Sequence, residues 1–322
     1  MTVSDTLASL GESATLARIF PRLPAAASQL LGPGDDAAVV AAPDGRFVVT
    51  TDMMIHGPDF RLAWSSPHDL GWKAAASNLA DVAAMGAVPT ALVVAIAAPA
   101  DSPITLLEGI ADGLRDGCAA MAPGCGVVGG DLSVSSTLTI AVTAFGDLEG
   151  RSPVLRSGGR VGDQVAVSGP LGAAAAALQL LFSGAVDAAG EPDAPRAAAL
   201  RDRTTAQLAP TPPIGDGPRA AIGGATAMLD LSDGLAIDSG RLANASGVCV
   251  AFDSSLLGAD VALALGGGED HSLLATFPAS VVLPGDFRRV GSVVAGDGIR
   301  LDGNPIASSG WDPYRNWNGG RG

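Results

Sequence analysis

The sequence predicts a two-domain α/β protein (an α+β arrangement) in which mixed β-sheets are covered by helices. The chain has 322 residues, which is long for one compact domain. Hydrophobic residues make up 48% of it but aromatic residues only 4%, so we expect a core of closely packed small side chains. Strand-like and helix-like segments also alternate along the chain, as they do in α/β proteins.

The first unit is expected to span residues 1–150. Residues 37–54 indicate a hairpin, because β-branched residues flank the Asp44-Gly45 turn. A helix rich in small residues then begins at Pro67 and ends near Gly86, where a glycine followed by a proline is typical stop chemistry. Other expected elements are a helix within 12–31, a strand at 90–98, a helix at 103–121 and strands near 126–129 and 137–146.

The second unit is expected to span residues 151–322, because residues 151–162 are rich in glycine and arginine and resemble a linker. Residues 183–219 are rich in proline, alanine and aspartate and predict a short helix followed by a loop. Further expected elements are strands at 163–169, 225–231 and 271–277, helices after residue 172 and at 235–247, and an aromatic cluster at 311–317.

Charge and composition exclude several classes of function. The net charge of −14 argues against nucleic acid or an anionic membrane as a partner. The N-terminus lacks the features of a secretory signal, and the longest apolar run, residues 91–100, is too short to span a bilayer. Three cysteines without CxxC spacing predict neither a disulfide framework nor a zinc site, so a cytoplasmic location is expected.

Aspartates at turns and strand ends form the strongest chemical signal. Magnesium is held by a few carboxylates together with water and phosphate oxygens, which fits a nucleotide enzyme. Aspartate also caps helices and forms turns, and this alternative accounts for any one position alone. The chain has a single lysine, so phosphate charge must be offset mainly by metal ions, arginine and backbone amides. The aspartates concerned are Asp35, Asp36, Asp52, Asp81, Asp131, Asp230 and Asp233.

Other polar positions are expected to line a ligand site. Lys73, Ser77 and Asp81 recur every four residues and therefore share one helix face. Neither the GxGxxG nor the GxxxxGK[ST] phosphate loop is present, although the glycines at 129–130 and 266–268 let a backbone approach a ligand closely or simply form tight turns. Arg156 is either a phosphate contact or an isolated surface arginine.

The motifs together resemble thiamine-monophosphate kinase, a family of the aminoimidazole ribonucleotide synthetase-like superfamily. The resemblance runs from about residue 11 to residue 314. It rests on GPGDDAAVV (32–40), TTDMMIHGPDF (50–60), DLGWKAAASNLADVAAMGAVP (69–89), GGDLS (129–133), RSGGRVGD (156–163), LDLSDGLAIDSGRLANASG (229–247), GGGEDHSLL (266–274) and GWDPY (310–314).

The resemblance implies transfer of the γ-phosphoryl group of ATP to thiamine monophosphate, giving thiamine diphosphate. It also implies a two-domain fold and a homodimer whose N-terminal sheets meet, with ATP bound largely by the N-terminal domain. The implied Mg²⁺ ligands are Asp36, Thr50, Thr51, Asp52, Asp81, Asp131, Asp230 and Asp233, with Asp52, Asp131 and Asp233 as catalytic residues. The implied ATP contacts are Gly130, Asp131, Arg156 and Ser232, and the implied substrate contacts are Asp59, Glu269 and Trp311.

This chain departs from the family pattern mainly on the substrate side. Asp59 stands where the family usually has a substrate-contacting histidine, and His271 stands where an aromatic residue usually follows GGGED. The magnesium set is intact, so phosphoryl transfer is the main hypothesis. Two alternatives keep the fold: an enzyme of the superfamily with another acceptor, or a nucleotide- or thiamine-phosphate-binding protein without turnover.

Overall fold

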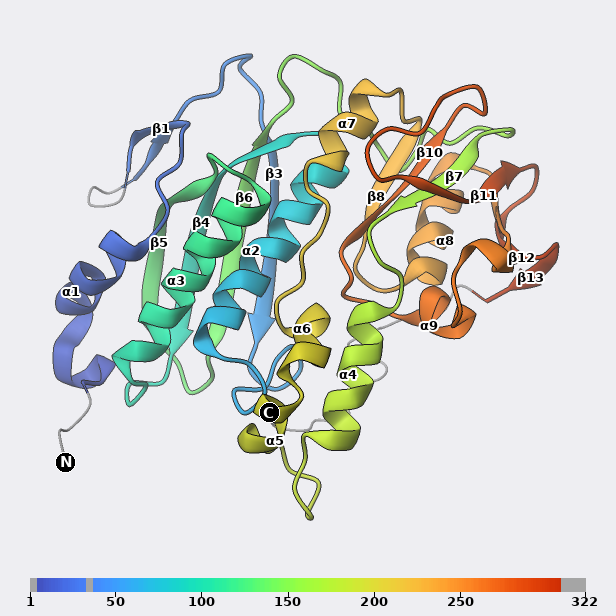
Figure 1. Cartoon of the computed structure of the whole chain (residues 1–322). Coiled ribbons are helices and arrows are strands. Elements are labelled where there is room, and N and C mark those ends of the chain that lie inside the picture. Colours follow the sequence, from blue (N-terminus) through green and yellow to red (C-terminus); the bar gives the residue numbers. More distant parts are fainter. Residues whose placement is uncertain (1–4, 33–36, 308–322) are drawn as a thin grey trace.

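The computed structural model describes residues 5–32 and 37–307, and Figure 1 shows two main sheets with helices between and around them. The first sheet has four strands in the order β3-β6-β4-β5 and the second has seven in the order β13-β12-β9-β11-β7-β10-β8. Each sheet contains parallel and antiparallel pairs, so the predicted mixed α/β class is confirmed. Within the described ranges, none of the helices has the length and apolar character needed to cross a membrane.

The four-stranded sheet is covered on one face by two long helices, which share one core with it. Alternate residues of its first strand, such as Met54, enter this core, while the residues between them point to the other face of the sheet and stay exposed. Of these, Val49 and Met53 are 54% and 58% exposed. The elements are β3 (Val48–Ile55), α2 (Pro67–Ala84), β4 (Val88–Ala98), α3 (Ile104–Met121), β5 (Gly126–Val134) and β6 (Thr139–Asp147).

Helix α2 is buried on most of its surface, which explains its composition of small residues. A capping box between Ser66 and Asp69 starts it, and Pro67 occupies the first turn. It crosses α3 at two glycines: a Cβ on Gly71 would lie 2.0 Å from the carbonyl oxygen of Ile110, and one on Gly113 would lie 2.0 Å from that of His68. The two backbones therefore touch, and only glycine fits at either position.

The seven-stranded sheet packs helices on both faces. Helices α8 (Leu235–Ser246) and α9 (Val261–Gly266) cover one face, and α7 (Asp216–Ile222) with the C-terminal end of α2 covers the other. Because α2 also packs on the four-stranded sheet, the contacts on this second face connect the two sheets. The strands are β7 (Gln164–Ser168), β8 (Ala227–Leu231), β9 (Cys249–Phe252), β10 (Ser272–Phe277), β11 (Arg288–Val294), β12 (Gly298–Leu301) and β13 (Asn304–Ile306), and a 3-10 turn, η2, spans Ser254–Leu256.

Three helices form a bridge below the two sheets: α4 (Ala173–Gly184), α5 (Ala194–Ala199) and α6 (Arg201–Leu208). Trp64 of the first unit packs into their apolar cluster and donates its indole hydrogen to the carbonyl oxygen of Ala185, 2.9 Å away. Arg61 lies over both Trp64 and Phe182, with its guanidinium carbon 4.4 and 4.7 Å from the ring centroids. These contacts attach the bridge to the first unit.

Two expectations about local structure are wrong. Val39–Val40 (β2) pairs with Gln29–Leu31 (β1), and β3 pairs with β6 instead, so residues 37–54 do not form a hairpin. Residues 183–219 are largely helical, in α5, α6 and most of α7. The helix expected within 12–31 begins earlier, as α1 (Leu7–Ile19), and continues as a 3-10 turn, η1 (Phe20–Arg22). We retain the boundary between residues 150 and 151 as a proposal.

Candidate active site between the two sheets

Strand β3 and helix α2 bring the first acidic residues together. Thr50 and Asp52 alternate toward α2, where the hydroxyl of Thr50 donates to Asp81 Oδ2 at 2.7 Å. The backbone N–H of Asp52 donates to Asn78 Oδ1 at 3.1 Å, which holds the middle of the strand against the helix. Thr51 points to the opposite face, where its hydroxyl donates to the carbonyl oxygen of Val142 at 2.9 Å.

Strand β8 delivers the second pair of carboxylates from the other sheet. Leu229 and Leu231 enter the core beneath α8, so the alternating residues Met228 and Asp230 face the end of α2. Asp233 follows in the next turn, where its Oδ2 accepts a hydrogen bond of 2.7 Å from Arg241 Nη1. Four carboxylates therefore face one another, from strand β3, helix α2, strand β8 and the turn after β8. We call Asp52, Asp81, Asp230 and Asp233 the acidic cluster.

The acidic cluster carries more negative charge than its surroundings offset. Burial raises the pKa of Asp81 to about 7, and the charges of Asp230 and Asp52 add to this effect. Burial likewise raises the pKa of Asp52, with smaller contributions from Asp230 and Asp233. Buried His271 lies 3.4 Å from Asp230 Oδ2 through Nδ1; burial opposes its charge, but Asp230 raises its pKa overall. A bound cation would relieve this repulsion.

The donor set fits magnesium in chemistry but does not form a closed cage. The acidic cluster and the neighbouring Thr50 offer carboxylate and hydroxyl oxygens, the ligand type that Mg²⁺ prefers. Within residues 5–32 and 37–307, no three acidic, histidine or cysteine side chains are close enough to hold an ion by themselves. Magnesium usually keeps several waters and shares substrate phosphates, so this open arrangement suits a metal that arrives with a nucleotide.

A second polar group lies farther toward the N-terminus of α2. Lys73 Nζ is 3.0 Å from Glu269 Oε2, and the Gln207 side-chain amide donates to the same oxygen. Asp59 is electrostatically coupled to both Glu269 and Lys73. Burial raises the pKa of Asp59, although the N–H of Ile55 donates to its Oδ2 at 2.7 Å and opposes the shift. We call Lys73, Gln207 and Glu269 the glutamate triad.

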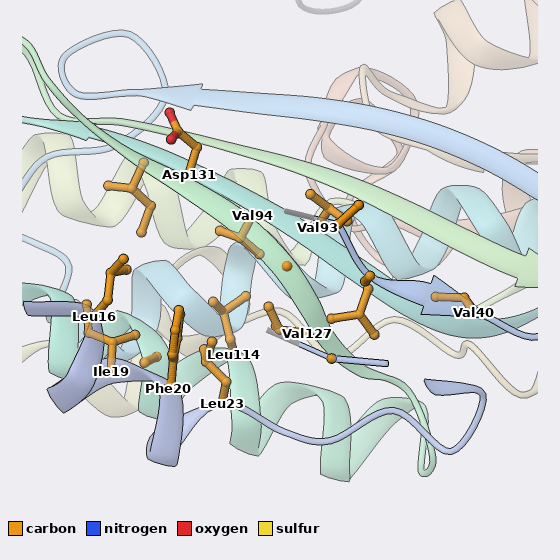
Figure 2. A pocket seen from close by; sticks show the side chains of 18 of the residues that line it. Leu16, Ile19, Phe20, Leu23, Val40, Val93, Val94, Leu114, Val127 and Asp131 are labelled. Atoms are coloured by element: carbon orange, nitrogen blue, oxygen red, sulfur yellow. The ribbon is translucent and has the colours of Figure 1, made fainter. Parts of the chain in front are cut away.

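A largely apolar cavity of about 1000 Å³ lies at the edge of the four-stranded sheet formed by strand β5. Helices α1 and α3 supply apolar walls, and Figure 2 shows Asp131 at one end of the cavity, apart from the apolar cluster that includes Phe20, Leu23 and Leu114. Gly130 also lines it; a Cβ there would lie 2.0 Å from the carbonyl oxygen of Val94, so β4 itself requires glycine at this position.

Asp131 is separated from the acidic cluster within one chain. Asp131 pairs with Ala95, Ala95 with Ala141, and Ala141 with Met53, so these four residues form one row across the sheet. Residues paired in this way share a face, and the row lies on the open face with Met53. Three strand spacings of about 4.8 Å place Asp131 about 14 Å from β3.

The chain is similar to known proteins over nearly its whole length. The family model described as AIR synthase related protein, N-terminal domain, matches residues 34–148. A curated thiamine-monophosphate kinase from Mycobacterium tuberculosis is 43% identical, with the match covering 98% of this chain and 93% of that protein. The chain belongs to the thiamine-monophosphate kinase family. The match includes both sheets, so it covers every part of the candidate site that the structure describes.

Solved structures of this family share the fold. The thiamine-monophosphate kinase of Stenotrophomonas maltophilia superposes with a TM-score of 0.74 at 30% identity, covering 91% of this chain and 96% of that one. AaThiL complexed with AMPPCP and TMP superposes with a TM-score of 0.72 at 31% identity, covering 86% and 90%.

The structure brings together some of the predicted thiamine-monophosphate kinase residues and separates others. Thr50, Asp52, Asp81, Asp230 and Asp233 meet in or beside the acidic cluster, and Asp59 lies beside Glu269. Ser232 follows the acidic strand, and its carbonyl oxygen accepts the N–H of Glu269 at 2.8 Å. Thr51, Gly130 and Asp131 lie elsewhere on the sheet, Arg156 is exposed in the linker, and Asp36 and Trp311 lie outside the described residues.

Sequence reasoning missed several residues of the site. Gln207 belongs to a segment with no recognisable pattern, so nothing in the sequence indicated that it would meet Glu269. Asp238 is one helical turn into α8; its Oδ2 accepts the N–H of Asp233 at 3.0 Å, and burial raises its pKa to about 6. Asp270 accepts the N–H groups of Gly172 and Ala174 and so caps α4.

Proposed function

We propose that this chain transfers the γ-phosphoryl group of ATP to the phosphate of thiamine monophosphate, forming thiamine diphosphate and ADP. The observation that carries this proposal is the acidic cluster, in which carboxylates from two different sheets face one another in a thiamine-monophosphate kinase fold. The relative AaThiL, solved with AMPPCP and TMP, supports a nucleotide and an acceptor bound together.

The apolar cavity around β5 is the proposed site of the adenine base. Its volume of about 1000 Å³ and its apolar walls are typical of a small-molecule pocket. Gly130 and Asp131 line it and would meet the phosphates, and Arg156 and Ser232 are proposed as further ATP contacts. Asp131 has no hydrogen-bond partner among the described residues, so its carboxylate is free to act on a ligand or its metal.

Magnesium is proposed as the metal that accompanies ATP. Its ligands would be Asp36, Thr50, Thr51, Asp52, Asp81, Asp131, Asp230 and Asp233, of which Asp52, Asp131 and Asp233 are proposed as catalytic. When bound, the metal offsets the charge of the phosphates during transfer. An oxygen of the acceptor phosphate forms a bond to the γ-phosphorus as the bond from that phosphorus to ADP breaks. The acceptor oxygen is already anionic, so no strong general base is needed.

A homodimer in the cytoplasm completes the proposal. The exposed side chains of Val49 and Met53 leave apolar surface uncovered on the face of the sheet opposite α2. Strands β3 and β5 are the two edges of that sheet. In a face-to-face pair whose two-fold axis runs along the strands, β3 of one copy lies near β5 of the other. In such a pair, Asp131 of the second copy would serve the acidic cluster of the first.

The experiment is a direct product assay. Purified protein is incubated with Mg²⁺, ATP and thiamine monophosphate, and thiamine diphosphate and ADP are quantified by chromatography. Equal amounts of both products are expected, and none with Asp52→Asn. ADP without thiamine diphosphate would contradict the proposed acceptor. Formation of neither product, with thiamine monophosphate still bound in a calorimeter, would contradict turnover itself.

A further inference from the structure

The glutamate triad contains an arrangement that the proposed reaction does not by itself explain. Lys73 is the only lysine of the chain, and its side chain is 8% exposed. It lies on α2, whereas Gln207 lies on α6 and Glu269 in the turn before β10. Three distant segments therefore converge on one carboxylate. A lysine is rarely buried unless it is paired, and here the pair joins the two sheets.

Both donors of the glutamate triad bind the same oxygen. Lys73 Nζ and the Gln207 amide each donate to Glu269 Oε2, while Oε1 has no partner among the described residues. The Glu269 side chain is 36% exposed, so the carboxylate is held from one side and open on the other. The positive charge of Lys73 is also the main influence that lowers the pKa of Glu269, against the effect of burial.

The backbone and Gln207 both hold conformations that cost stability. Glu269 has a φ of +65°, in the left-handed region that residues other than glycine seldom adopt. A carboxylate can only accept, so the amide nitrogen of Gln207 must face Glu269 and its oxygen must face away. That oxygen is buried and has no donor within the described ranges. An unsatisfied buried acceptor is unfavourable, so Gln207 serves the carboxylate rather than the fold.

We propose that Lys73 and Gln207 are positioning residues that present Glu269 Oε1 to the exocyclic amino group of the acceptor's pyrimidine ring. This inference rests on the proposed function. The amino group is the only N–H donor of thiamine monophosphate, and an ionised carboxylate held at one oxygen is a strong, directional acceptor for it. The glutamate triad thus selects an acceptor that carries an aminopyrimidine.

The test compares two acceptors and four variants. A thiamine monophosphate analogue with hydrogen in place of the exocyclic amino group (the deamino analogue) removes the donor. Lys73→Met and Gln207→Met are expected to raise the KM for thiamine monophosphate about tenfold, the loss of one charged hydrogen bond. The KM for ATP should stay within about twofold because the variants leave the nucleotide site intact. With the deamino analogue, the two substitutions should have little effect. Arg203→Met, an exposed change on α6, is the matched control.

Stability measurements separate positioning from a structural role. Gln207→Met removes the orphaned amide oxygen, so its melting temperature should equal or exceed that of the wild type while its KM rises. Lys73→Arg keeps the charge and should restore part of the lost affinity. An unchanged KM in both methionine variants, or an equal rise in KM for both acceptors, would overturn the proposal. If the wild type forms no thiamine diphosphate, the proposed function fails first, and calorimetric binding of the two acceptors still tests the triad.

Discussion

Asp131 and Asp52 lie on opposite faces of the same sheet, three strands apart. Both are proposed to act on one nucleotide with its metal, which a single chain does not allow in this geometry. If a second copy supplies Asp131, each active site needs one intact Asp52 and one intact Asp131 from different chains.

Mixing two inactive variants tests this arrangement. Asp52→Asn and Asp131→Asn homodimers should each lack turnover. After exchange of subunits, half of the dimers are mixed, and each holds one intact site, so about a quarter of wild-type activity should return. Product formation is measured before and after exchange. Sites built within one chain would recover nothing, because every chain carries a defect.

Asp81→Asn is expected to abolish turnover and to stabilise the metal-free protein. The substitution keeps an oxygen that can accept from Thr50 but removes a buried charge facing Asp230 and Asp52. The melting temperature without metal should therefore rise, while the stabilisation by added Mg²⁺ with ATP should shrink. Differential scanning calorimetry with and without these ligands checks both parts. If Mg²⁺ with ATP still raises the melting temperature of the variant as much as that of the wild type, Asp81 does not hold the metal.

The pH dependence of stability follows from the same carboxyl group. Its pKa is 3.8 in the unfolded chain and about 7 in the fold, so between these values the folded state binds more protons. The contribution of Asp81 to folding stability is thus full below about pH 4 and is lost as the pH rises through 7. Urea unfolding of metal-free protein should show this loss, and Asp81→Asn should flatten it. An unchanged profile in the variant would contradict the assignment.

Gly113→Ala is expected to destabilise the fold by about 1–3 kcal/mol, because overpacking at a backbone contact forces two helices apart. The added methyl group would meet the carbonyl oxygen of His68. Gly215→Ala is the matched control: its φ of −64° suits alanine, and nothing lies within 4 Å of the new Cβ. Urea midpoints of the two variants should move in opposite directions. Equal midpoints would mean that α2 and α3 tolerate separation.

Local chemistry made much of the fold predictable. The bounds of α2 follow from Pro67 and the Met85-Gly86 stop, and its buried, small-residue composition follows from its place between two sheets. The aspartates at strand ends could also be predicted as site residues, because strand alternation decides which face of the sheet each carboxylate points to. Both signals depend on a few neighbouring residues.

The rest depended on contacts between distant segments. Val39 and Val40 have the composition of a hairpin strand, yet β6 offers β3 eight paired residues and outcompetes them. Helix α6 has no apolar periodicity of its own; it is held by packing against α4 and by the ion pair between Arg201 and buried Asp69. Likewise, the side of the sheet on which Asp131 lies is decided by pairing register, which motif spacing does not reveal.

Helix α2 carries both Lys73 and Asp81, eight residues apart on one face, and eight residues of α-helix span about 12 Å. Under the proposed function, one end of this span addresses the acceptor's ring and the other addresses the metal and phosphates. The helix therefore fixes the distance between the two sites. An acceptor must have a matching distance between its amino group and its phosphate. One residue inserted between the two ends would turn Lys73 and Asp81 onto different faces. Both sites would remain, but they would no longer be aligned to bind the two ends of one acceptor.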